Sequence, residues 1–544
     1  MRSLSPRSLA LSMIALLVCA PILALMGSWL QWNSASFNVL AELTQTVLPD
    51  YIASSLVLCL GVAFGVTVIG LSTAAAVTLF KFPGQSWIEW ALLLPMAMPA
   101  YVVAYAYTDF LQYSGPLQNL IRHSFALEGR VFPEIRSLGG AIFVFTLALY
   151  PYVYLLVRSA LTERASKLME AARMLGAPLS RRIASVALPM ARPAIAAGVA
   201  LALMETLADF GVSSYFGIQT FTAGVYKAWL VMDNRIAASQ LATLLLVVIL
   251  VLLQAEKIAQ NRMRFSMSKS NLGMSSEAQP IELSRTLQWL ILATCSLPIF
   301  FGFVLPVVLM LVPFTQSDIS VPWDRFGVWA FNSLKLGLTT AVLAVALALV
   351  ISFATRFQAS TGTRLASQVV GLGYAVPGAV VVVGLLLPIN WLQTYWPESQ
   401  VGYWLTATSI GLIWAYLVRF TAVALQTIQS GYSRVPGSLD DAAQTLGVTG
   451  FELLRKVHAP LLKRSIYAAT LLVFVDVMKE LPATLVLRPF NSDTLAVVAY
   501  QLARDERLSE AALPSLALVL VGLLPVILLS RSLKQTHRDG PAGL

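Results

Sequence analysis

The feature that most constrains this chain is a series of about twelve apolar segments, each long enough to cross a lipid bilayer. A helix of about 20 mainly apolar residues spans hydrocarbon about 30 Å thick. The runs are continuous and lack the alternation of barrel strands, so they predict helices. Only 12% of the 544 residues are charged, against about 25% in a soluble domain. We therefore expect an all-α integral membrane protein.

The predicted spans divide equally between the two halves of the chain. They lie near residues 10–31, 55–79, 87–109, 139–161, 187–212 and 237–255 in the first half, and near 287–313, 332–354, 366–389, 405–427, 465–486 and 512–530 in the second.

The net charge of +10 is better explained by topology than by nucleic-acid binding. The Lys and Arg residues are scattered among short loops instead of forming one basic face. With a cytoplasmic N-terminus, most of them fall in cytoplasmic loops, as the positive-inside rule requires. The first apolar run is longer than the core of a usual signal peptide, so we expect an uncleaved helix. We predict a multi-pass membrane protein in contact with lipid, with both termini cytoplasmic and no nucleic-acid partner.

The cysteines and histidines do not suggest a metal site. Cys19, Cys59 and Cys295 all lie within predicted spans and are interpreted as small apolar side chains. The three histidines, His123, His458 and His537, fall in different loops, and His458 is expected to have a structural role.

The two halves of the chain repeat one pattern of an acid, two alanines, a glycine and a proline, with identical internal spacing. The matched positions are Glu170, Ala171, Ala172, Gly176 and Pro189 in the first copy, and Asp441, Ala442, Ala443, Gly447 and Pro460 in the second. The interval in residue number from Glu170 to Asp441 is the same for every matched pair, and we call it the repeat offset.

The repeat extends upstream, where Ser55 matches Ser333 and Pro99 matches Pro377. The interval from Ser55 to Ser333, here called the upstream offset, is slightly larger than the repeat offset because the intervening loops differ in length. We predict two tandem six-helix repeats, residues 1–255 and 286–544, joined by a basic, Ser-rich cytoplasmic linker at 256–285. Six helices per repeat keep both copies in one orientation, related by an axis along the membrane normal.

Each copy of the pattern predicts a helix, a turn at glycine, a second short helix and a proline in the first turn of a new span. An ordinary basic loop that only satisfies the positive-inside rule is the alternative. The identical spacing in both halves argues against it.

This pattern resembles the EAA loop of binding-protein-dependent ABC permeases. The resemblance covers essentially the whole chain and implies that both loops dock on ATP-binding subunits, two copies per permease. Asp441 in place of Glu keeps the charge but shortens the side chain. The chain has no GxxxxGK[ST] phosphate loop. We therefore expect a transport subunit that is not an enzyme and binds no cofactor, with ATP used by the partner in alternating access.

Four acids lie in otherwise apolar segments and match across the repeat: Glu205 with Asp476, and Asp209 with Glu480. Each pair has the spacing of one helical turn, so we expect it to share one helix face. Charge inside a membrane is costly and usually functional. We predict that the four acids line the translocation pathway. A hard cation such as ferric iron prefers oxygen ligands, so they are also tentative metal ligands, with Tyr215 nearby. Local pairing, for example of Glu480 with Lys479, is the alternative.

The residues around these acids resemble fused iron(III) permeases. The similar stretches are Leu207-Ala208-Asp209-Phe210-Gly211, Lys479-Glu480-Leu481-Pro482-Ala483-Thr484, Leu487-Arg488-Pro489-Phe490 and Thr494-Leu495-Ala496.

This resemblance implies a permease of the bacterial inner membrane that receives ferric iron from a periplasmic substrate-binding protein. The partner would bind loops 110–138, 213–236 and 487–511, with Arg504 and Arg507 pairing with its acids. Relatives of the same superfamily that import thiamine, polyamines, phosphonates or sulfate leave other ligands open. An ion-coupled secondary transporter is the alternative of another class, and it has no need of the paired loops.

Overall fold

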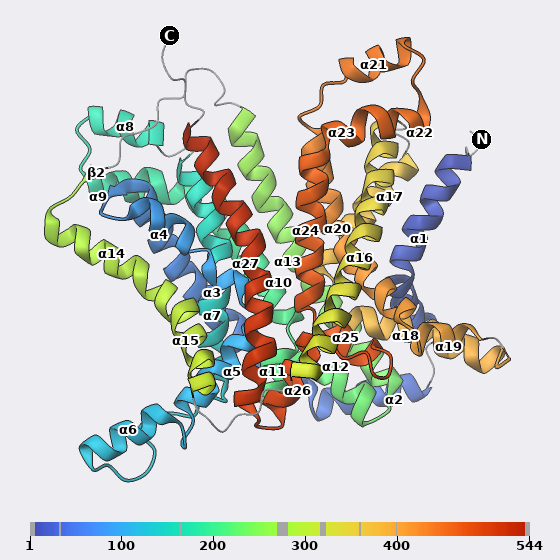
Figure 1. The fold of residues 1–544 in the computed structure, drawn as a ribbon, viewed down its shortest axis with the longest axis horizontal. Coiled ribbons are helices and arrows are strands. Elements are labelled where there is room, and N and C mark those ends of the chain that lie inside the picture. The colour runs from blue at the N-terminus through green and yellow to red at the C-terminus, as the bar shows by residue number, and fades with distance from the viewer. Residues whose placement is uncertain are drawn as a thin grey trace. The chain divides into compact units, whose positions relative to one another are not determined.

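The computed structural model describes residues 6–31, 34–162, 166–268, 281–315, 323–357, 361–398 and 400–538. These residues form helices almost throughout, which confirms the all-α prediction (Figure 1). Within the described ranges the strands are β1 (Phe80–Lys81) and β2 (Ile281–Glu282), which pair in parallel over their short length.

Nine helical segments of the described chain are long and apolar enough to cross a membrane. They are Leu48–Leu79, Leu138–Ala160, Leu179–Ala208, Arg235–Ala259, Arg285–Phe314, Trp323–Phe357, Gly378–Tyr395, Ser409–Tyr432 and Leu508–Leu528. Each overlaps one of the twelve predicted spans.

The other three predicted spans have a different form. The span near 87–109 is a pair of helical segments, Gln85–Ala97 and Ala100–Phe125, bent by 89°. Helix α24 ends at Lys479 after 17 residues, short of the predicted 486. In the first span, the apolar helical stretch Leu16–Leu30 is too short to meet the same criterion. The break after Ala97 is explained by Pro99, which fixes an extended connection before the next helix.

The chain forms two compact units, each built from three separate parts of the sequence. Unit one comprises residues 1–45, 224–246 and 322–498, and unit two comprises residues 46–223, 247–321 and 499–544.

The helices of unit one are α1 (Pro6–Gly27), α2 (Ser34–Gln45), α16 (Trp323–Phe357), α17 (Thr361–Gly371), α18 (Gly378–Tyr395), α19 (Val401–Thr406), α20 (Ser409–Tyr432), α21 (Ser438–Thr445), α22 (Gly450–Leu453), α23 (Ala459–Leu461), α24 (Lys463–Lys479) and α25 (Pro482–Leu487).

The helices of unit two are α3 (Leu48–Leu79), α4 (Gln85–Ala91), α5 (Ala100–Leu111), α6 (Pro116–Phe125), α7 (Leu138–Ala160), α8 (Ser166–Met174), α9 (Leu179–Arg182), α10 (Leu188–Ala208), α11 (Gly211–Tyr215), α14 (Arg285–Ile299), α15 (Leu305–Leu311) and α27 (Leu508–Arg538). Three helices cross a boundary between the units: α12 (Phe221–Tyr226), α13 (Arg235–Ser268) and α26 (Leu495–Arg504).

Each unit has a core of three packed helices. In unit two α3 packs against α7 and α10, and in unit one α16 packs against α20 and α24. Small residues permit close packing, because a Cβ at Gly61 or Gly70 would collide with α7. The first helix of the chain, α1, packs against α17 and α18 in unit one. There Trp414 donates a hydrogen bond of 2.8 Å to the Leu17 carbonyl.

The repeats along the sequence therefore differ from the compact units in space. Helix α1 joins the core helices of the second repeat, whereas α14 and α15, which begin that repeat, pack against α3, α4 and α5 in unit two. The predicted boundaries 1–255, 256–285 and 286–544 describe the repeat in the sequence and stay a prediction. In the linker, residues 256–268 continue α13, and residues 269–280 lie outside the described part of the chain.

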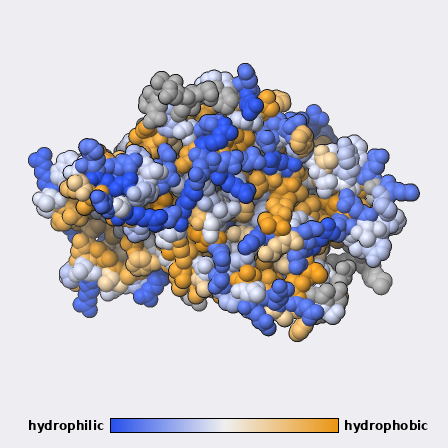
Figure 2. Space-filling model, turned by 90° about the horizontal axis from the view of Figure 1, so that it is seen from below, coloured by the Kyte–Doolittle hydropathy of each residue, from blue (hydrophilic) through white to orange (hydrophobic). Residues whose placement is uncertain are grey.

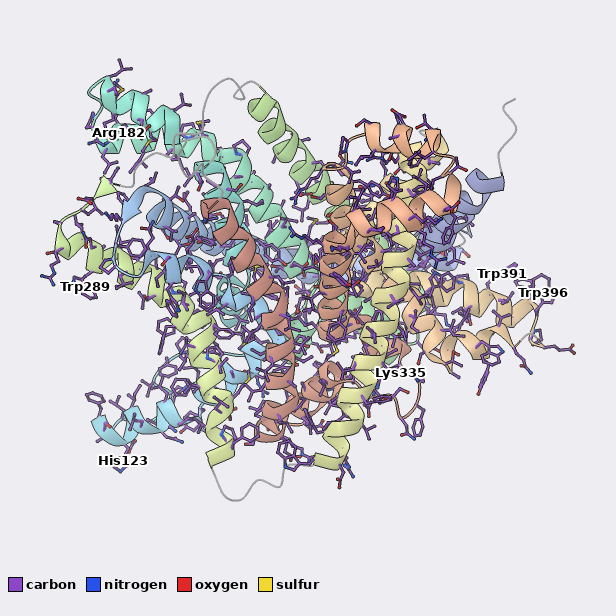
Figure 3. The ribbon with its side chains drawn as sticks, turned by 45° about the horizontal axis from the view of Figure 1, so that its top comes forward. His123, Arg182, Trp289, Lys335, Trp391 and Trp396 are labelled. Atoms are coloured by element: carbon purple, nitrogen blue, oxygen red, sulfur yellow. The ribbon has the colours of Figure 1, made fainter. Side chains whose placement is uncertain are left out.

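Apolar side chains remain exposed on both units, as expected of surfaces that face lipid. Figure 2 shows hydrophobic residues among hydrophilic ones on one face of the molecule. In unit one, Trp391, Trp396 and Trp404 on and between α18 and α19 are about half exposed or more (Figure 3). Tryptophan is typical of the membrane–water interface. The start of α20, which follows α19, is therefore expected to lie at one membrane surface. Helix α21, which follows the end of α20, is expected near the opposite surface.

Candidate functional site

The two repeated loops, residues 166–189 and 438–460, have the same backbone. Helix α8 carries Glu170, Ala171 and Ala172, and α21 carries Asp441, Ala442 and Ala443. Each helix ends before a glycine in the left-handed region, Gly176 with φ of 77° and Gly447 with φ of 78°. The predicted glycine turns are thus confirmed.

The hydrogen bonds at these helix ends also match between the repeats. In the first loop, Gly176 N–H donates to the Arg173 carbonyl and Ala177 N–H to the Ala172 carbonyl. In the second loop, Gly447 donates to Gln444 and Val448 to Ala443, all at positions related to the first set by the repeat offset. This is the Schellman arrangement, which satisfies the last carbonyls of a helix.

The segment after each glycine is a short α-helix followed by one π-helical turn. The π turns occupy Ile183–Ala187 and Leu454–His458, which the repeat offset again relates to each other. Pro189 then lies in the first turn of α10 and Pro460 in the first turn of α23. The predicted order of helix, glycine turn, short helix and proline is therefore observed in both loops. Arg182 on α9 illustrates the basic character of the first loop (Figure 3).

Large apolar side chains are exposed on both loops. Met174 and Leu175 are 90% and 87% exposed beside Gly176, and Leu446 and Phe451 are 82% and 75% exposed on either side of Gly447. Leu175 and Leu446 are equivalent positions in the repeat. Exposed apolar side chains next to a fixed turn are typical of a protein-docking surface.

The predicted acids lie at the ends of two equivalent helices. Glu205 and Asp476 fall in the last turns of α10 and α24, while Asp209 and Glu480 come directly after these helices in extended conformation. The prediction that each pair shares one helix face is therefore wrong.

The second acid of each pair instead accepts hydrogen bonds from the first amides of the short helix that follows, α11 or α25. Asp209 Oδ1 accepts a hydrogen bond of 2.8 Å from Val212 N–H. Glu480 accepts from the N–H groups of Ala483 and Thr484 at 2.9 and 3.0 Å. Carboxylates commonly satisfy free amides at helix starts in this way.

Glu480 has a partner that sequence reasoning missed. Arg419 on α20 lies 3.1 Å from its carboxylate, and the two residues are 8% and 5% exposed. A Cβ added to Gly378 would lie 2.8 Å from the same carboxylate, so glycine leaves room for the pair. The predicted local partner, Lys479, is not the one observed at this distance. The signal was available, because Arg419 is a charged residue inside the apolar segment 405–427.

Asp209 belongs to unit two and Glu480 to unit one. Each carboxylate accepts hydrogen bonds from the start of the short helix that follows it. Among the described residues no group of three or more His, Cys, Asp or Glu side chains is placed to hold a metal ion. The pathway and metal roles of Glu205, Asp209, Asp476 and Glu480 remain predictions.

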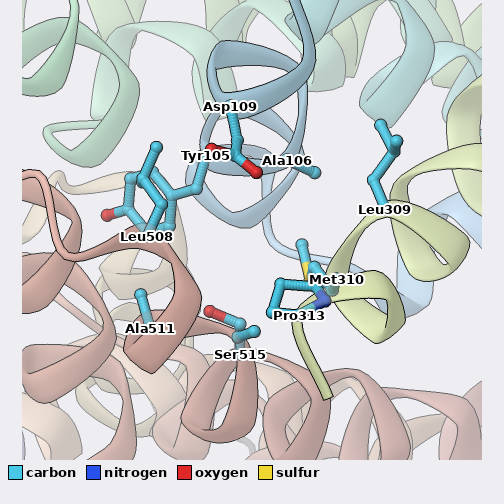
Figure 4. A pocket seen from close by; sticks show the side chains of 10 residues that line it. Tyr105, Ala106, Asp109, Leu309, Met310, Pro313, Leu508, Ala511 and Ser515 are labelled. Carbon is cyan, nitrogen blue, oxygen red and sulfur yellow. The ribbon is translucent and has the colours of Figure 1, made fainter. Parts of the chain in front are cut away.

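A small cavity in unit two involves residues that the sequence did not suggest. It measures about 20 Å³ and lies between α5, α15 and α27, with Asp109, Met310 and Ser515 in its lining (Figure 4). A single water molecule needs roughly 10–15 Å³ of this kind of space. The cavity therefore has room for about one water molecule and is too small for thiamine or a polyamine.

The two arginines predicted to bind an external partner, Arg504 and Arg507, are both exposed, and the partner role stays a prediction. Arg507 pairs with Glu510, with Nε and Oε1 2.7 Å apart. Arg136, from a loop before α7, pairs with Glu506 at 3.3 Å. His123 lies on α6, exposed, away from the cores (Figure 3). His537 belongs to α27, and its side chain lies outside the described part of the structure.

The apolar helices and the paired loops define a multi-spanning membrane permease. A family model described as "binding-protein-dependent transport system inner membrane component" matches residues 66–265 and 351–538. The chain belongs to this family, in a fused arrangement with two copies of the domain, and is a multi-pass inner membrane protein.

Two curated relatives match along most of the chain, and a third matches about a third of it. The Fe(3+)-transport system permease protein FbpB 2 of Haemophilus influenzae is 24% identical over 487 residues, which cover 89% of this chain and 90% of the relative. The ferric transport system permease protein FbpB of Actinobacillus pleuropneumoniae is 23% identical, covering 86% of this chain and 69% of the relative. A putative 2-aminoethylphosphonate transport system permease protein, PhnU of Salmonella choleraesuis, is 26% identical over 36% of this chain and 70% of the relative.

Proposed function

We propose that this chain is the membrane permease of an ATP-driven importer and that it moves ferric iron into the cytoplasm. The observation that carries the proposal is the match to a ferric permease along 89% of this chain and 90% of the relative, which includes both repeats. The match to a phosphonate permease extends over only 36% of the chain. Iron is therefore the first substrate to test, and 2-aminoethylphosphonate is the second.

The two loops are proposed to dock two copies of a separate ATP-binding subunit. The support is structural: the same turn recurs around Gly176 and Gly447, with exposed apolar side chains beside it. ATP-driven closure of the two ATP-binding subunits would move the loops and switch the permease between outward and inward states. In this topology the loops and both termini are cytoplasmic, and a periplasmic binding protein delivers iron on the other side.

The acids are proposed to contribute to the pathway unequally. Glu205 and Asp476 lie in the last turns of their helices, whereas Glu480 is neutralised by Arg419 and occupied as a cap. Hard oxygen ligands suit ferric iron, and Glu480, already paired with Arg419, is the weakest of the four candidates for direct contact.

Uptake of radiolabelled ferric iron in cells that lack this gene tests the proposal. The unaltered chain, or a variant with both Gly176→Asp and Gly447→Asp, is restored, and 2-aminoethylphosphonate, thiamine and spermidine are assayed in parallel. We expect iron uptake with the unaltered chain only. Uptake of another solute without iron would remove iron as substrate and leave the permease assignment in place.

A further inference from the structure

The second loop is attached to its unit by a buried cluster of charged and aromatic side chains. Asp440, the residue before the predicted docking acid Asp441, is only 7% exposed. Arg356, in the last turn of α16, donates from Nε to Asp440 Oδ2 at 2.6 Å. His458, fully buried in the π turn, has its Nε2 3.1 Å from Asp440 Oδ1. The carboxylate thus bonds the start of α21 to α16 and lies against the end of the π turn, where Asp440 Oδ1 and His458 Nε2 are close but not aligned for a hydrogen bond.

Arg356 also ties the start of the loop to the end of α16. Its guanidinium donates to the backbone carbonyls of Tyr432 at 3.3 Å, Val435 at 3.0 Å and Pro436 at 3.3 Å. These carbonyls belong to the end of α20 and the turn before α21. Arg356 therefore uses its donors to hold three backbone carbonyls between α20 and α21, a role that suits the several donors of the planar guanidinium.

Aromatic rings enclose His458 on three sides. Its ring centre lies 5.5 Å from Phe353, 5.6 Å from Phe357 and 5.4 Å from Tyr432. Phe353 and Phe357 belong to α16, so the π turn packs on the same helix that Arg356 fixes to Asp440. The second loop is therefore held to α16 at both its start and its end.

At the described positions that match the cluster, the first loop has uncharged residues. At the repeat offset, Asp440 corresponds to Met169 and His458 to Ala187, both buried. At the upstream offset, Arg356 corresponds to Thr78, whose hydroxyl donates to Ala74 within its own helix. No charge of the second cluster has a counterpart at these three positions.

Unit two has its own charged pair, but it lies outside the first loop. Arg158, at the end of α7, pairs with Glu89 on α4. The equivalent residues in unit one are Gln429 and Ser367, which form a neutral hydrogen bond of 2.9 Å. The two units thus retain one contact between helices, which is charged beside α4 in unit two and neutral in unit one. Only unit one has the charged cluster on its loop at these matched positions.

We propose that Arg356, Asp440 and His458 are positioning residues that make the second loop move as one body with α16, while the first loop is held less rigidly. The two docking sites for ATP-binding subunits are therefore mechanically unequal. This inference rests on the proposed function only in its last step, because the attachment itself is a property of the permease chain.

Matched spin labels on the full-length permease in lipid nanodiscs test the attachment without any partner. Arg173→Cys and Gln444→Cys are equivalent exposed positions, on α8 and α21, and are labelled one at a time. The three native cysteines are first replaced by Ala. We expect the label at 444 to be less mobile than the label at 173. Asp440→Asn should raise mobility at 444 several-fold and leave 173 unchanged.

A second variant separates positioning from folding. Arg356→Lys keeps the charge without the fork, so it should loosen the label at 444 partly, while the amount of folded permease stays at the unaltered level. The triple change Arg356→Thr, Asp440→Met and His458→Ala copies the first repeat and should make the two labels alike. Equal mobility at 173 and 444 in the unaltered chain, or no response to Asp440→Asn, would overturn the proposal.

The functional step is tested with the ATP-binding subunit and the binding protein present in liposomes. Asp440→Asn should lower the amount of iron moved per ATP hydrolysed several-fold, because one loop no longer transmits its movement. An unchanged ratio would refute mechanical inequality. If no ATP-binding subunit associates with the unaltered chain, the proposed function fails, and the label result still decides the attachment.

Discussion

Gly176 and Gly447 place the same left-handed turn in the two loops, and the surrounding space does not demand glycine. A Cβ added to either residue would meet no atom within 4 Å. The requirement is therefore conformational, since residues with a Cβ disfavour positive φ by about 1 kcal/mol or more.

Replacing Gly447 by Ala isolates this requirement. We expect the loop to lose about 1 kcal/mol of local stability, so amides of α21 should exchange roughly fivefold faster in hydrogen-exchange measurements. Gly437→Ala is the control, because Gly437 has φ of −65° and an equally open surround. If the amides of α21 exchange at the same rate in Gly447→Ala and Gly437→Ala, then placing alanine in the left-handed turn does not destabilise the loop.

His458 gives the second loop a dependence on pH. Burial lowers the pKa of the imidazole, Arg356 also lowers it, and Asp440 opposes both. An opened loop, with an ordinary pKa of about 6.5, then takes up the proton more readily than the packed loop. The neutral imidazole of His458 therefore stabilises the packed loop fully at pH values above the pKa of the opened loop. This stabilisation declines as the pH falls below that pKa.

Hydrogen exchange of α21 at about pH 8 and about pH 5.5, corrected for intrinsic rates, measures this dependence. Acidification should lower the opening free energy in the unaltered chain. His458→Phe, which retains an aromatic ring among the same neighbours, should remove the change. A response that survives His458→Phe must come from another group.

At the scale of elements, the acids show what a sequence repeat can and cannot predict. Their equivalence is evident from the repeat offset, and both second acids do play the same capping role. The helix end between the acids was not predictable from the apolar pattern, which continues through it. Caps depend on where the next helix starts, and the ion pair with Arg419 depends on the packing of α20 against α24.

Arg419→Met should be strongly destabilising, because it leaves the carboxylate of Glu480 buried without its counter-ion. Loss of one partner of a buried pair costs about 3–5 kcal/mol. Adding Glu480→Gln removes the charge while keeping an oxygen to accept the cap, so the double variant should recover most of the loss in thermal unfolding.

The exposed pair of Lys456 with Glu452 provides the matched control for this test. Lys456→Met should cost less than about 1 kcal/mol, as exposed pairs usually do. If Arg419→Met proves as mild as Lys456→Met, then Glu480 is not neutralised by Arg419 and becomes available as a pathway ligand.

At the scale of the whole molecule, the composition and the repeat predict the class of fold and the paired loops. Nine of the twelve predicted spans correspond to long apolar helices. The assignment of α1 to unit one and of α14 and α15 to unit two could not be predicted, because all three are mainly apolar and their sequences do not single out one core. The pattern of residues in a membrane helix gives little information about its neighbour, since lipid is as apolar as protein.

Fusion of both repeats in one chain predicts the composition of the assembled transporter. One permease chain presents two loops, so we expect it to bind two copies of the ATP-binding subunit. Native mass spectrometry of the purified complex measures this ratio directly. A particle with two permease chains would show that each chain uses only one loop.

The central claim, that ATP hydrolysis on another chain drives transport through this one, is tested most directly by reconstitution in liposomes. The permease, its ATP-binding subunit and the iron-loaded binding protein are combined, and ferric iron entering the lumen is measured with ATP, without ATP, and with a proton or sodium gradient alone. We predict uptake that requires ATP and is lost when both glycines, Gly176 and Gly447, are changed to Asp. Uptake driven by an ion gradient in the absence of ATP would contradict the account and identify the chain as a secondary transporter.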